Sequence, residues 1–338
     1  MINDRIRYLA ELGNQLSTSA ELNRVIERAS GKNPWFSETF VRQSLNAIIA
    51  DMLNEQKLNE WLSLYPVKPV NRTIGLIFAG NVPLVGLHDF LCCYLTGCSM
   101  KIKQSSKDDD LFPFVLQTLT SIDPSLNGQV EITEQLKNFQ AVIATGSDNT
   151  NRYFEYYFRH HPHILRKNRN SVAILTGEET ENDLVKLADD IFLYFGFGCR
   201  NVSKLYLPLG YDITKLFPAF EKNYKWLHEH NKYMSNYDYN RTLLMLNKTP
   251  HLANEFVMIT ENKSISSSIG CLNYEYWHDE RVLKTQLHFQ ADKIQCVVAA
   301  EPHRWVGSPV VCFGEAQHPQ LNDYADGKDT IAFLLSLN

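Results

Sequence analysis

Residues 73–97 read TIGLIFAGNVPLVGLHDFLCCYLTG, and this stretch decides the fold. It opens on a continuous apolar run, which is typical of a strand covered on both faces. A turn follows, and apolar residues then recur at helical spacing as far as Gly97. Asn81, His88 and Asp89 interrupt the apolar sequence at depths where a membrane span does not carry them. We therefore interpret the stretch as a buried strand, a turn and a helix.

Beyond residue 97 the chain keeps alternating between strand-like and helix-like patterns, in two series separated by the polar, basic stretch 166–171. The segments expected to be strands are 98–104, 129–133 and 141–146 in the first series, and 171–175, 203–208, 255–260, 269–277, 293–300 and 308–314 in the second. The segments expected to be helices are 111–122, 149–161, 181–195, 212–229 and 236–246. Such alternation favours βαβ units, so the sequence predicts an α/β protein with mainly parallel sheets and two lobes.

The region before this alternation reads as helices. Ser37 is the expected N-cap of one helix, because apolar residues follow it at helical spacing from Phe40 to Met52. The apolar face of that helix must pack against another part of the protein, and we expect it to cover the lobe that follows.

The composition restricts the class of protein. The chain has 33 lysines and arginines against 38 acidic residues, and this net charge of −5 argues against a general nucleic-acid-binding protein. Its seven cysteines form no CxxC pair, and the charged start lacks the apolar core of a signal peptide. We expect a reducing, cytoplasmic location and no structural zinc. The histidines of HHPHIL (160–165) lack the helical spacing of metal ligands, so no metal site is expected.

Two turns follow apolar strands at the place where open α/β sheets bind ligands. In ATGS, Gly146 would let the backbone approach a ligand, and Ser147 would cap a helix and face a phosphate. In GNVP, Pro83 is expected in the first helical turn, and the Asn81 amide would donate to an oxyanion. An ordinary turn and an N-cap asparagine are the alternatives, and no Gly-x-Gly-x-x-Gly fingerprint of dinucleotide-binding proteins is present.

Taken in order, the motifs resemble those of the aldehyde dehydrogenase superfamily. AGNVPL (79–84) stands where that family has Pro-Trp-Asn-Phe-Pro, and Lys103 matches the lysine that ends its next strand. ATGS (144–147) matches Thr-Gly-Ser, and GFGC (196–199) matches Gly-Gln-x-Cys. The resemblance makes Cys199 the nucleophile, and its two preceding glycines are expected to turn the chain sharply and present the thiol. The other six cysteines fit apolar positions and are expected to behave as small hydrophobes.

One departure from the superfamily pattern is informative. RKNR (166–169) stands where the family has Glu-Leu-Gly-Gly, so the glutamate that activates water is missing. This points to the acylating branch, which acts on acyl-CoA thioesters. Within that branch the GNVP turn, the CRNVSKLYLP run (199–208) and the tail 313–335 resemble acyl-CoA reductases of the LuxC type. The resemblance covers about residues 75–335.

The resemblance implies an aldehyde dehydrogenase-like fold, with a parallel-sheet nucleotide-binding lobe and a second α/β catalytic lobe. We expect residues 1–65 to form a helical segment on the cofactor lobe, and 66–168 to form the nucleotide-binding domain. Residues 169–305 would be the catalytic domain, and 306–338 a tail that returns to the cofactor lobe or to a partner subunit.

The implied reaction is reduction of a fatty or other acyl-CoA thioester to an aldehyde through an acyl-cysteine on Cys199. The backbone N–H of Cys199 and the Asn81 amide would hold the oxyanion, and Arg200 would favour the thiolate. Lys103 would contact the adenosine ribose of a nicotinamide cofactor. Ser106, followed by Lys107, replaces a glutamate that selects NAD in the family, so NADPH is preferred over NADH. Alternatively, this segment is simply a solvated loop, and the choice between NADPH and NADH stays open.

Other functions stay open at this point. Cys199 would also serve an acyltransferase or thioesterase that uses no nicotinamide, or the chain would be a noncatalytic partner subunit of an acyl-processing complex. An acyl carrier protein is an alternative donor to CoA. Because LuxC-type enzymes work with acyl-supplying partners and the superfamily forms homo-oligomers, the resemblance implies both kinds of assembly.

Overall fold

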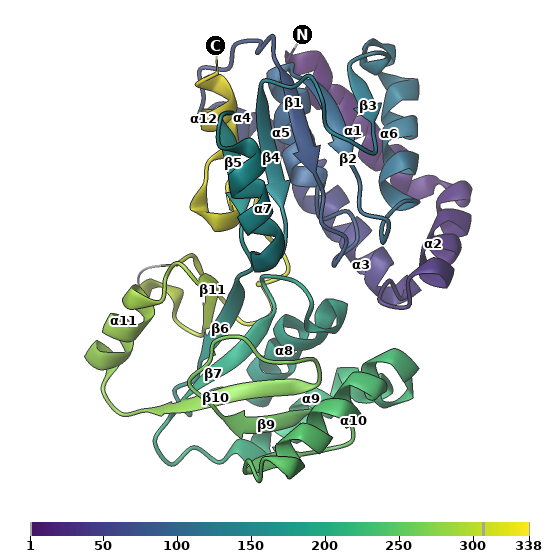
Figure 1. Cartoon of the computed structure of the whole chain (residues 1–338). Helices are drawn as coiled ribbons and strands as arrows, with labels where there is room; N and C mark the ends of the chain where they lie inside the picture. Colours follow the sequence, from purple (N-terminus) through teal and green to yellow (C-terminus); the bar gives the residue numbers. More distant parts are fainter. Residues whose placement is uncertain (1, 306–307, 338) are drawn as a thin grey trace. The chain divides into compact units, whose positions relative to one another are not determined.

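The computed structural model describes residues 2–305 and 308–337. The chain folds into two compact units (Figure 1). Unit 1 consists of Met1–Asn168 and Pro319–Asn338, and unit 2 of Arg169–His318. The segment after β12 (Val310–Val311) belongs to unit 2 as far as His318. There the backbone N–H groups of Gly314 and Ala316 donate to the buried carboxylate of Asp190.

Unit 1 contains a five-stranded, fully parallel sheet in the order β3-β2-β1-β4-β5. Its strands are β1 (Thr73–Ile77), β2 (Ser99–Lys103), β3 (Val130–Ile132), β4 (Ala141–Thr145) and β5 (His163–Arg166). The first four confirm the sequence prediction. Strand β5 was not predicted, because its histidines and the preceding proline mask the short apolar pair Ile164 and Leu165.

Helices cover this sheet (Figure 1). Among them, α5 (Leu87–Thr96) has all of its side chains buried except that of His88. It ends at Gly97, as predicted, where φ is +84°. Ser37 is confirmed as the N-cap of α3, since its hydroxyl accepts the N–H of Phe40. The other helical segments of unit 1 are α1 (Ile2–Thr18), α2 (Ala20–Lys32), α3 (Glu38–Ala47) with its π-helical continuation Ile48–Met52, α4 (Glu55–Leu62), α6 (Leu111–Ile122), α7 (Asp148–Phe158), α12 (Thr330–Leu335) and the 3-10 turns Pro124–Leu126 and Ala325–Gly327.

Unit 2 contains a seven-stranded sheet in the order β12-β11-β6-β7-β10-β9-β8, in which only the pair β8–β9 is antiparallel among the described strands. Its strands are β6 (Asn170–Ile174), β7 (Val202–Pro208), β8 (His251–Ala253), β9 (Met258–Glu261), β10 (Cys271–Trp277), β11 (Ile294–Ala299) and β12 (Val310–Val311). The sequence predicted all of them except the short edge strand β8.

The helical segments of unit 2 are α8 (Glu181–Phe192), α9 (Leu216–Tyr224), α10 (Asn231–Leu246), α11 (Glu280–Phe289) and the 3-10 turns Leu193–Gly196, Ile213–Lys215, Lys225–Glu229 and Pro302–Arg304. Helix α10 begins five residues before the expected residue 236, and α11 was not predicted. No helix in the described parts of the chain combines the length and apolar character that crossing a bilayer requires.

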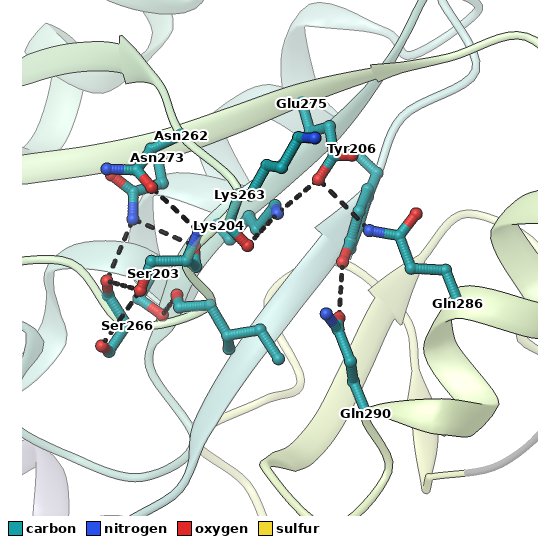
Figure 2. A network of polar contacts seen from close by, with 12 residues as sticks. Ser203, Lys204, Tyr206, Asn262, Lys263, Ser266, Asn273, Glu275, Gln286 and Gln290 are labelled. Carbon is teal, nitrogen blue, oxygen red and sulfur yellow. Dashed lines mark hydrogen bonds and ion pairs between the residues drawn. The ribbon is translucent and has the colours of Figure 1, made fainter.

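Strand β7 carries Lys204, whose side chain is fully buried, and Figure 2 shows the polar groups that surround it. The ammonium of Lys204 donates to the Glu275 carboxylate at 2.6 Å and to the Lys263 carbonyl at 2.9 Å. The neighbouring Ser203 hydroxyl donates to the Ile265 carbonyl at 2.7 Å. A buried charge is tolerated only when it is paired and hydrogen bonded, and these partners meet that requirement. They also fix the loop after β9 against the first half of β7.

Candidate active site

The loops that follow β1, β2 and β4 meet at one edge of the unit 1 sheet. Ile77 at the end of β1 pairs with Lys103 on one side and with Ala144 on the other. The strand order reverses between β1 and β4, and open parallel sheets bind ligands at such a switch point. Of the predicted site residues, Asn81 follows β1, Lys103 ends β2, and Gly146 follows β4 directly.

The β1–α5 loop differs from the expected helix start. Residues 81–86 form turns and α5 begins only at Leu87, so Pro83 lies outside the first helical turn. Leu84 has a φ of +57°, and the Asp108 carboxylate accepts its N–H at 2.9 Å. Ser44 donates to the Pro83 carbonyl at 3.1 Å. Contacts with other segments therefore hold this loop, and burial raises the pKa of Asp108 to about 6 while the Leu84 N–H opposes the shift.

The β2–α6 loop lies directly against the β1–α5 loop. A Cβ built on Gly80 would stand 2.3 Å from the Ser105 hydroxyl oxygen, so only glycine permits this approach. Lys103, Ser106 and Lys107 are exposed beside it. This loop therefore presents two lysines and a hydroxyl at the sheet edge, followed by the acidic residues Asp108, Asp109 and Asp110.

The β4–α7 turn completes this edge. Ser147 is confirmed as the N-cap of α7, because its hydroxyl accepts the N–H of Thr150 at 3.3 Å. Asn151 donates from its side-chain amide to the Gly146 carbonyl at 2.9 Å. These hydrogen bonds hold the β4–α7 turn in place. The start of helix α7 also brings backbone N–H groups to the switch point.

In unit 2, a tight turn joins α8 to Cys199. Tyr194, Phe195 and Gly196 follow one another in the left-handed region, with φ of 54°, 57° and 77°. Each nonglycine residue there costs about 1 kcal/mol or more. Gly196 meets the expectation for a turn glycine, but Gly198 does not show a positive φ. The two strained side chains are buried, and the Phe195 ring lies 4.4 Å from that of His230.

Asn201 closes this turn. Its side-chain amide donates to the carbonyls of Asp190, Ile191 and Leu193 at the end of α8, at 3.2, 3.2 and 2.8 Å. Its amide oxygen accepts the N–H of Gly198 at 2.8 Å. Asn201 is buried, so these bonds satisfy groups that water does not reach.

Cys199 is half-buried at the amino-terminal end of β7. Its carbonyl accepts the hydroxyl of Ser171, which opens β6, at 3.1 Å. The same hydroxyl accepts the N–H of Cys296 from β11 at 3.2 Å. Three elements of the sheet therefore fix the backbone that carries the thiol.

Arg200 has a structural partner in the segment after β12. Its guanidinium donates to the carbonyl of Ala316 and is buried. Asp190 accepts the N–H groups of Gly314 at 2.7 Å and of Ala316 at 2.9 Å. Burial raises the pKa of Asp190 to about 7, although the two N–H groups act in the opposite direction. The turn that precedes Cys199, residues 194–198, and residues 314–316 thus share two buried polar anchors, Arg200 and Asp190.

Several residues that build the turn were missed by sequence reasoning. Asp190 carried a signal, because it lies on the apolar face of α8, where a charged residue is unexpected. Ser171 and Asn201 carried none, because their partners lie on other elements. The remaining cysteines are buried as predicted except Cys271, which is half-buried, and Cys312, which is exposed because β12 ends before it.

His88 and the histidine-rich segment show no site. The His88 ring nitrogen Nε2 lies 2.9 Å from the Leu321 carbonyl, and burial lowers the pKa of this histidine. This contact gives the His88 ring a hydrogen-bond partner within the fold of unit 1. Among the residues that the structure describes, no group of three or more histidine, cysteine or acidic side chains is placed to hold a metal ion.

Comparisons with known proteins extend these observations. The family model described as acyl-CoA reductase (LuxC) matches residues 6–214. The chain is similar to an aldehyde dehydrogenase of Mycobacterium tuberculosis in complex with NAD+, at 12% identity and a TM-score of 0.66, covering 88% of this chain and 73% of that one. Aldehyde dehydrogenase 21 of Physcomitrella patens, in complex with the product succinate, gives 12% identity and a TM-score of 0.68, covering 100% and 84%.

The betaine aldehyde dehydrogenase of Staphylococcus aureus, in complex with NAD+, gives 11% identity and a TM-score of 0.67, covering 92% of this chain and 74% of that one. At such identities these similarities establish the fold, which is aldehyde dehydrogenase-like as predicted. No curated protein that was compared matches the chain.

Replacing Asn201 tests its role in the nucleophile turn. Asn201→Ala leaves several buried backbone groups without partners, so we expect the free energy of unfolding to fall by about 3 kcal/mol. Iodoacetamide should also label Cys199 faster, because the turn loosens. Urea denaturation and mass spectrometry measure the two effects. The control is Asn236→Ala on α10, whose amide bonds only the Lys232 carbonyl at the surface. A loss for Asn201→Ala no larger than that of the control would contradict the assignment.

The raised pKa of Asp190 predicts a pH dependence of stability. Its folded pKa of about 7 exceeds its ordinary value of 3.8, so the folded state holds the proton more tightly than the unfolded chain. Asp190 therefore contributes stability at low pH that is lost as the pH rises toward 7, with a slope of at most about 1.4 kcal/mol per pH unit. Urea denaturation between about pH 5 and about pH 8 should show wild type losing stability relative to Asp190→Asn, with a constant difference above the folded pKa. Parallel profiles would refute the assignment.

Proposed function

This chain belongs to the LuxC family of acyl-CoA reductases, and we propose that it reduces an acyl-CoA thioester, including fatty acyl thioesters, to the aldehyde through an acyl-cysteine on Cys199. The observation that carries the proposal is the family match over residues 6–214, which includes both the switch-point loops and the nucleophile turn. Overall, acyl-CoA, a reduced nicotinamide cofactor and a proton would be converted into aldehyde, CoA and the oxidised cofactor.

Cys199 would act as the nucleophile. Its thiolate forms a bond to the thioester carbonyl, and the carbon–sulfur bond to CoA then breaks, so CoA leaves as its thiolate. The acyl-cysteine would then accept a hydride, which a reduced nicotinamide would supply when bound, and become a thiohemiacetal. Collapse of that species releases the aldehyde and restores the Cys199 thiolate. The rigid backbone around Cys199, which Ser171 and Asn201 hold, supports this role because a nucleophile must be fixed in position.

The oxyanion would be stabilised by the backbone N–H of Cys199 and the side-chain amide of Asn81. Asn81 is half-buried in a loop whose shape other segments fix, as a preorganised donor requires. RKNR replaces the segment in which hydrolytic members of the aldehyde dehydrogenase superfamily carry a water-activating glutamate, and Arg166 of that stretch is buried in contacts of its own. This favours release of the acyl group as an aldehyde rather than as an acid.

The cofactor would bind at the switch point of unit 1. Its phosphates fit the Gly146–Ser147 turn at the start of α7, and Lys103 would contact the adenosine ribose. Exposed Ser106 and Lys107 carry no carboxylate that would repel a 2′-phosphate, so we propose NADPH as the preferred cofactor, with NADH as the alternative. Aldehyde dehydrogenases of the same fold were solved with NAD+, which supports a nicotinamide in general.

Removing the nucleophile tests the function directly. Cys199→Ala should abolish acyl-CoA-dependent oxidation of NADPH, because no thioester can form on the enzyme. The absorbance of NADPH follows the reaction, with NADH in parallel and a panel of acyl-CoAs. Cys312→Ser is the matched control, since Cys312 is exposed in the same unit and should be dispensable. Release of CoA by wild type without cofactor oxidation would instead indicate an acyltransferase or thioesterase, and activity that survives in Cys199→Ala would refute the site.

The proposed oxyanion donor gives a second test. Asn81→Ala should lower kcat by about 10²–10³, because one donor to the transition-state charge is lost. The dissociation constant for NADPH, measured by fluorescence titration, should change little. If kcat changes less than about threefold while the variant folds normally, Asn81 is not the donor.

A further inference from the structure

The C-terminal tail, residues 319–338, contains the motif YADG, to which the sequence assigns no chemistry. In unit 1 this tail surrounds the side chain of Arg166, the last residue of β5. Arg166 is only 4% exposed. Its guanidinium donates to the Ala325 carbonyl at 3.0 Å and to the Thr330 hydroxyl at 2.9 Å. Two separate points of the tail are thus bound to one buried cation.

The same guanidinium reaches the helix that follows the β1–α5 loop. It donates to the buried carboxylate of Asp89 at 2.5 Å. Asp89 lies in the first turn of α5, immediately after the loop that carries Asn81. The ion pair therefore ties the end of β5 to the start of the helix that follows the loop on one side of the switch point.

The backbone of Arg166 reaches the loop on the other side. Its carbonyl accepts the Asn151 side-chain amide at 2.8 Å and the N–H of Gly146 at 3.3 Å. The Asn151 amide also holds the Gly146 carbonyl from the opposite direction. Arg166 thus contacts the first turn of α5, which directly follows one of the two loops that flank the proposed cofactor site, and Gly146 in the other loop.

The tail keeps this residue in place by further contacts around it. The Lys328 ammonium donates to the Leu165 carbonyl at 3.3 Å, and the N–H of Lys167 donates to the Asp326 carboxylate at 3.3 Å. The hydroxyl of Tyr324 accepts the indole N–H of Trp61 at 2.9 Å. The residues on both sides of Arg166 are therefore also bound by the tail.

We propose that Arg166 is a positioning residue for the nicotinamide cofactor, and that the tail turn 325–328 orients it. The inference rests on the proposed function, because it assumes that the cofactor bridges the loops after β1 and β4. Arg166 then sets the distance between those loops through its fork-shaped guanidinium and its carbonyl. A displacement of about 1 Å at such a point can cost about 100-fold in rate. Lysine keeps the charge but cannot reproduce the fork.

The test compares Arg166→Lys with wild type in cofactor binding and in catalysis. We expect the dissociation constant and the KM for NADPH to rise about tenfold, while the KM for acyl-CoA and the rate of Cys199 acylation stay within about twofold. Arg72→Lys is the matched control, because Arg72 also bonds the tail, at the Leu337 carbonyl, yet it precedes β1 at the far end of the strand. It should leave all these constants unchanged.

Thr330→Val is a milder second variant, which removes one hydrogen bond to Arg166 and keeps the side-chain shape. It should raise the dissociation constant for NADPH about two- to threefold, and it decides the matter if Arg166→Lys does not fold. Unchanged cofactor affinity in a folded Arg166→Lys variant, or in Thr330→Val where Arg166→Lys does not fold, overturns the inference. An equal rise in the KM values for cofactor and acyl-CoA also overturns it, since that would indicate a merely structural role. If wild type binds neither NADPH nor NADH, the proposed function fails instead.

Discussion

Parallel pairing of the strands determines where the loops that follow them lie. Strands that run in one direction end at one edge of the sheet, so the chain must return by helices, and every loop after a strand joins the same edge. In unit 1 this brings Asn81, Lys103 and the Gly146–Ser147 turn together from distant parts of the sequence. In unit 2 helix α8 returns to the opposite edge, so Cys199 lies where β7 begins.

Buried polar side chains then fix the loops that the sheets bring together. The side chain of Asn201 caps the carboxyl end of α8 and holds the turn before Cys199. The Asp190 carboxylate binds the backbone of residues 314–316. In unit 1 the ion pair of Arg166 and Asp89 likewise holds separate segments together. In the sheet of unit 2 the ion pair of Lys204 and Glu275 does the same. Each of these groups would be costly in an apolar interior, and each is paired. Their number around the loops fits a protein that must hold a nucleophile and a dinucleotide in fixed positions.

The sequence predicts much of this fold, because apolar periodicity reports local burial directly. It found β1, α5 with its Gly97 end, the Ser147 cap and the strand before each important loop. It missed β5, whose apolar pair is too short to give a pattern, and it placed Pro83 in a helix that begins four residues later. The loop shape there depends on Asp108 and Ser44, which lie far away in the chain. The same limit applies to Arg200, whose partner Ala316 lies far along the chain, since hydrogen bonds between distant segments leave no local signal.

We propose that Cys199 carries the acyl group between CoA and the nicotinamide. Intact-mass spectrometry of the enzyme mixed with acyl-CoA in the absence of cofactor tests it most directly. The account predicts one acyl adduct that maps to Cys199, release of an equal amount of CoA, and loss of the adduct as aldehyde when NADPH is added. An enzyme that oxidises NADPH with acyl-CoA but never carries an acyl group, or carries it on another residue, would contradict the account.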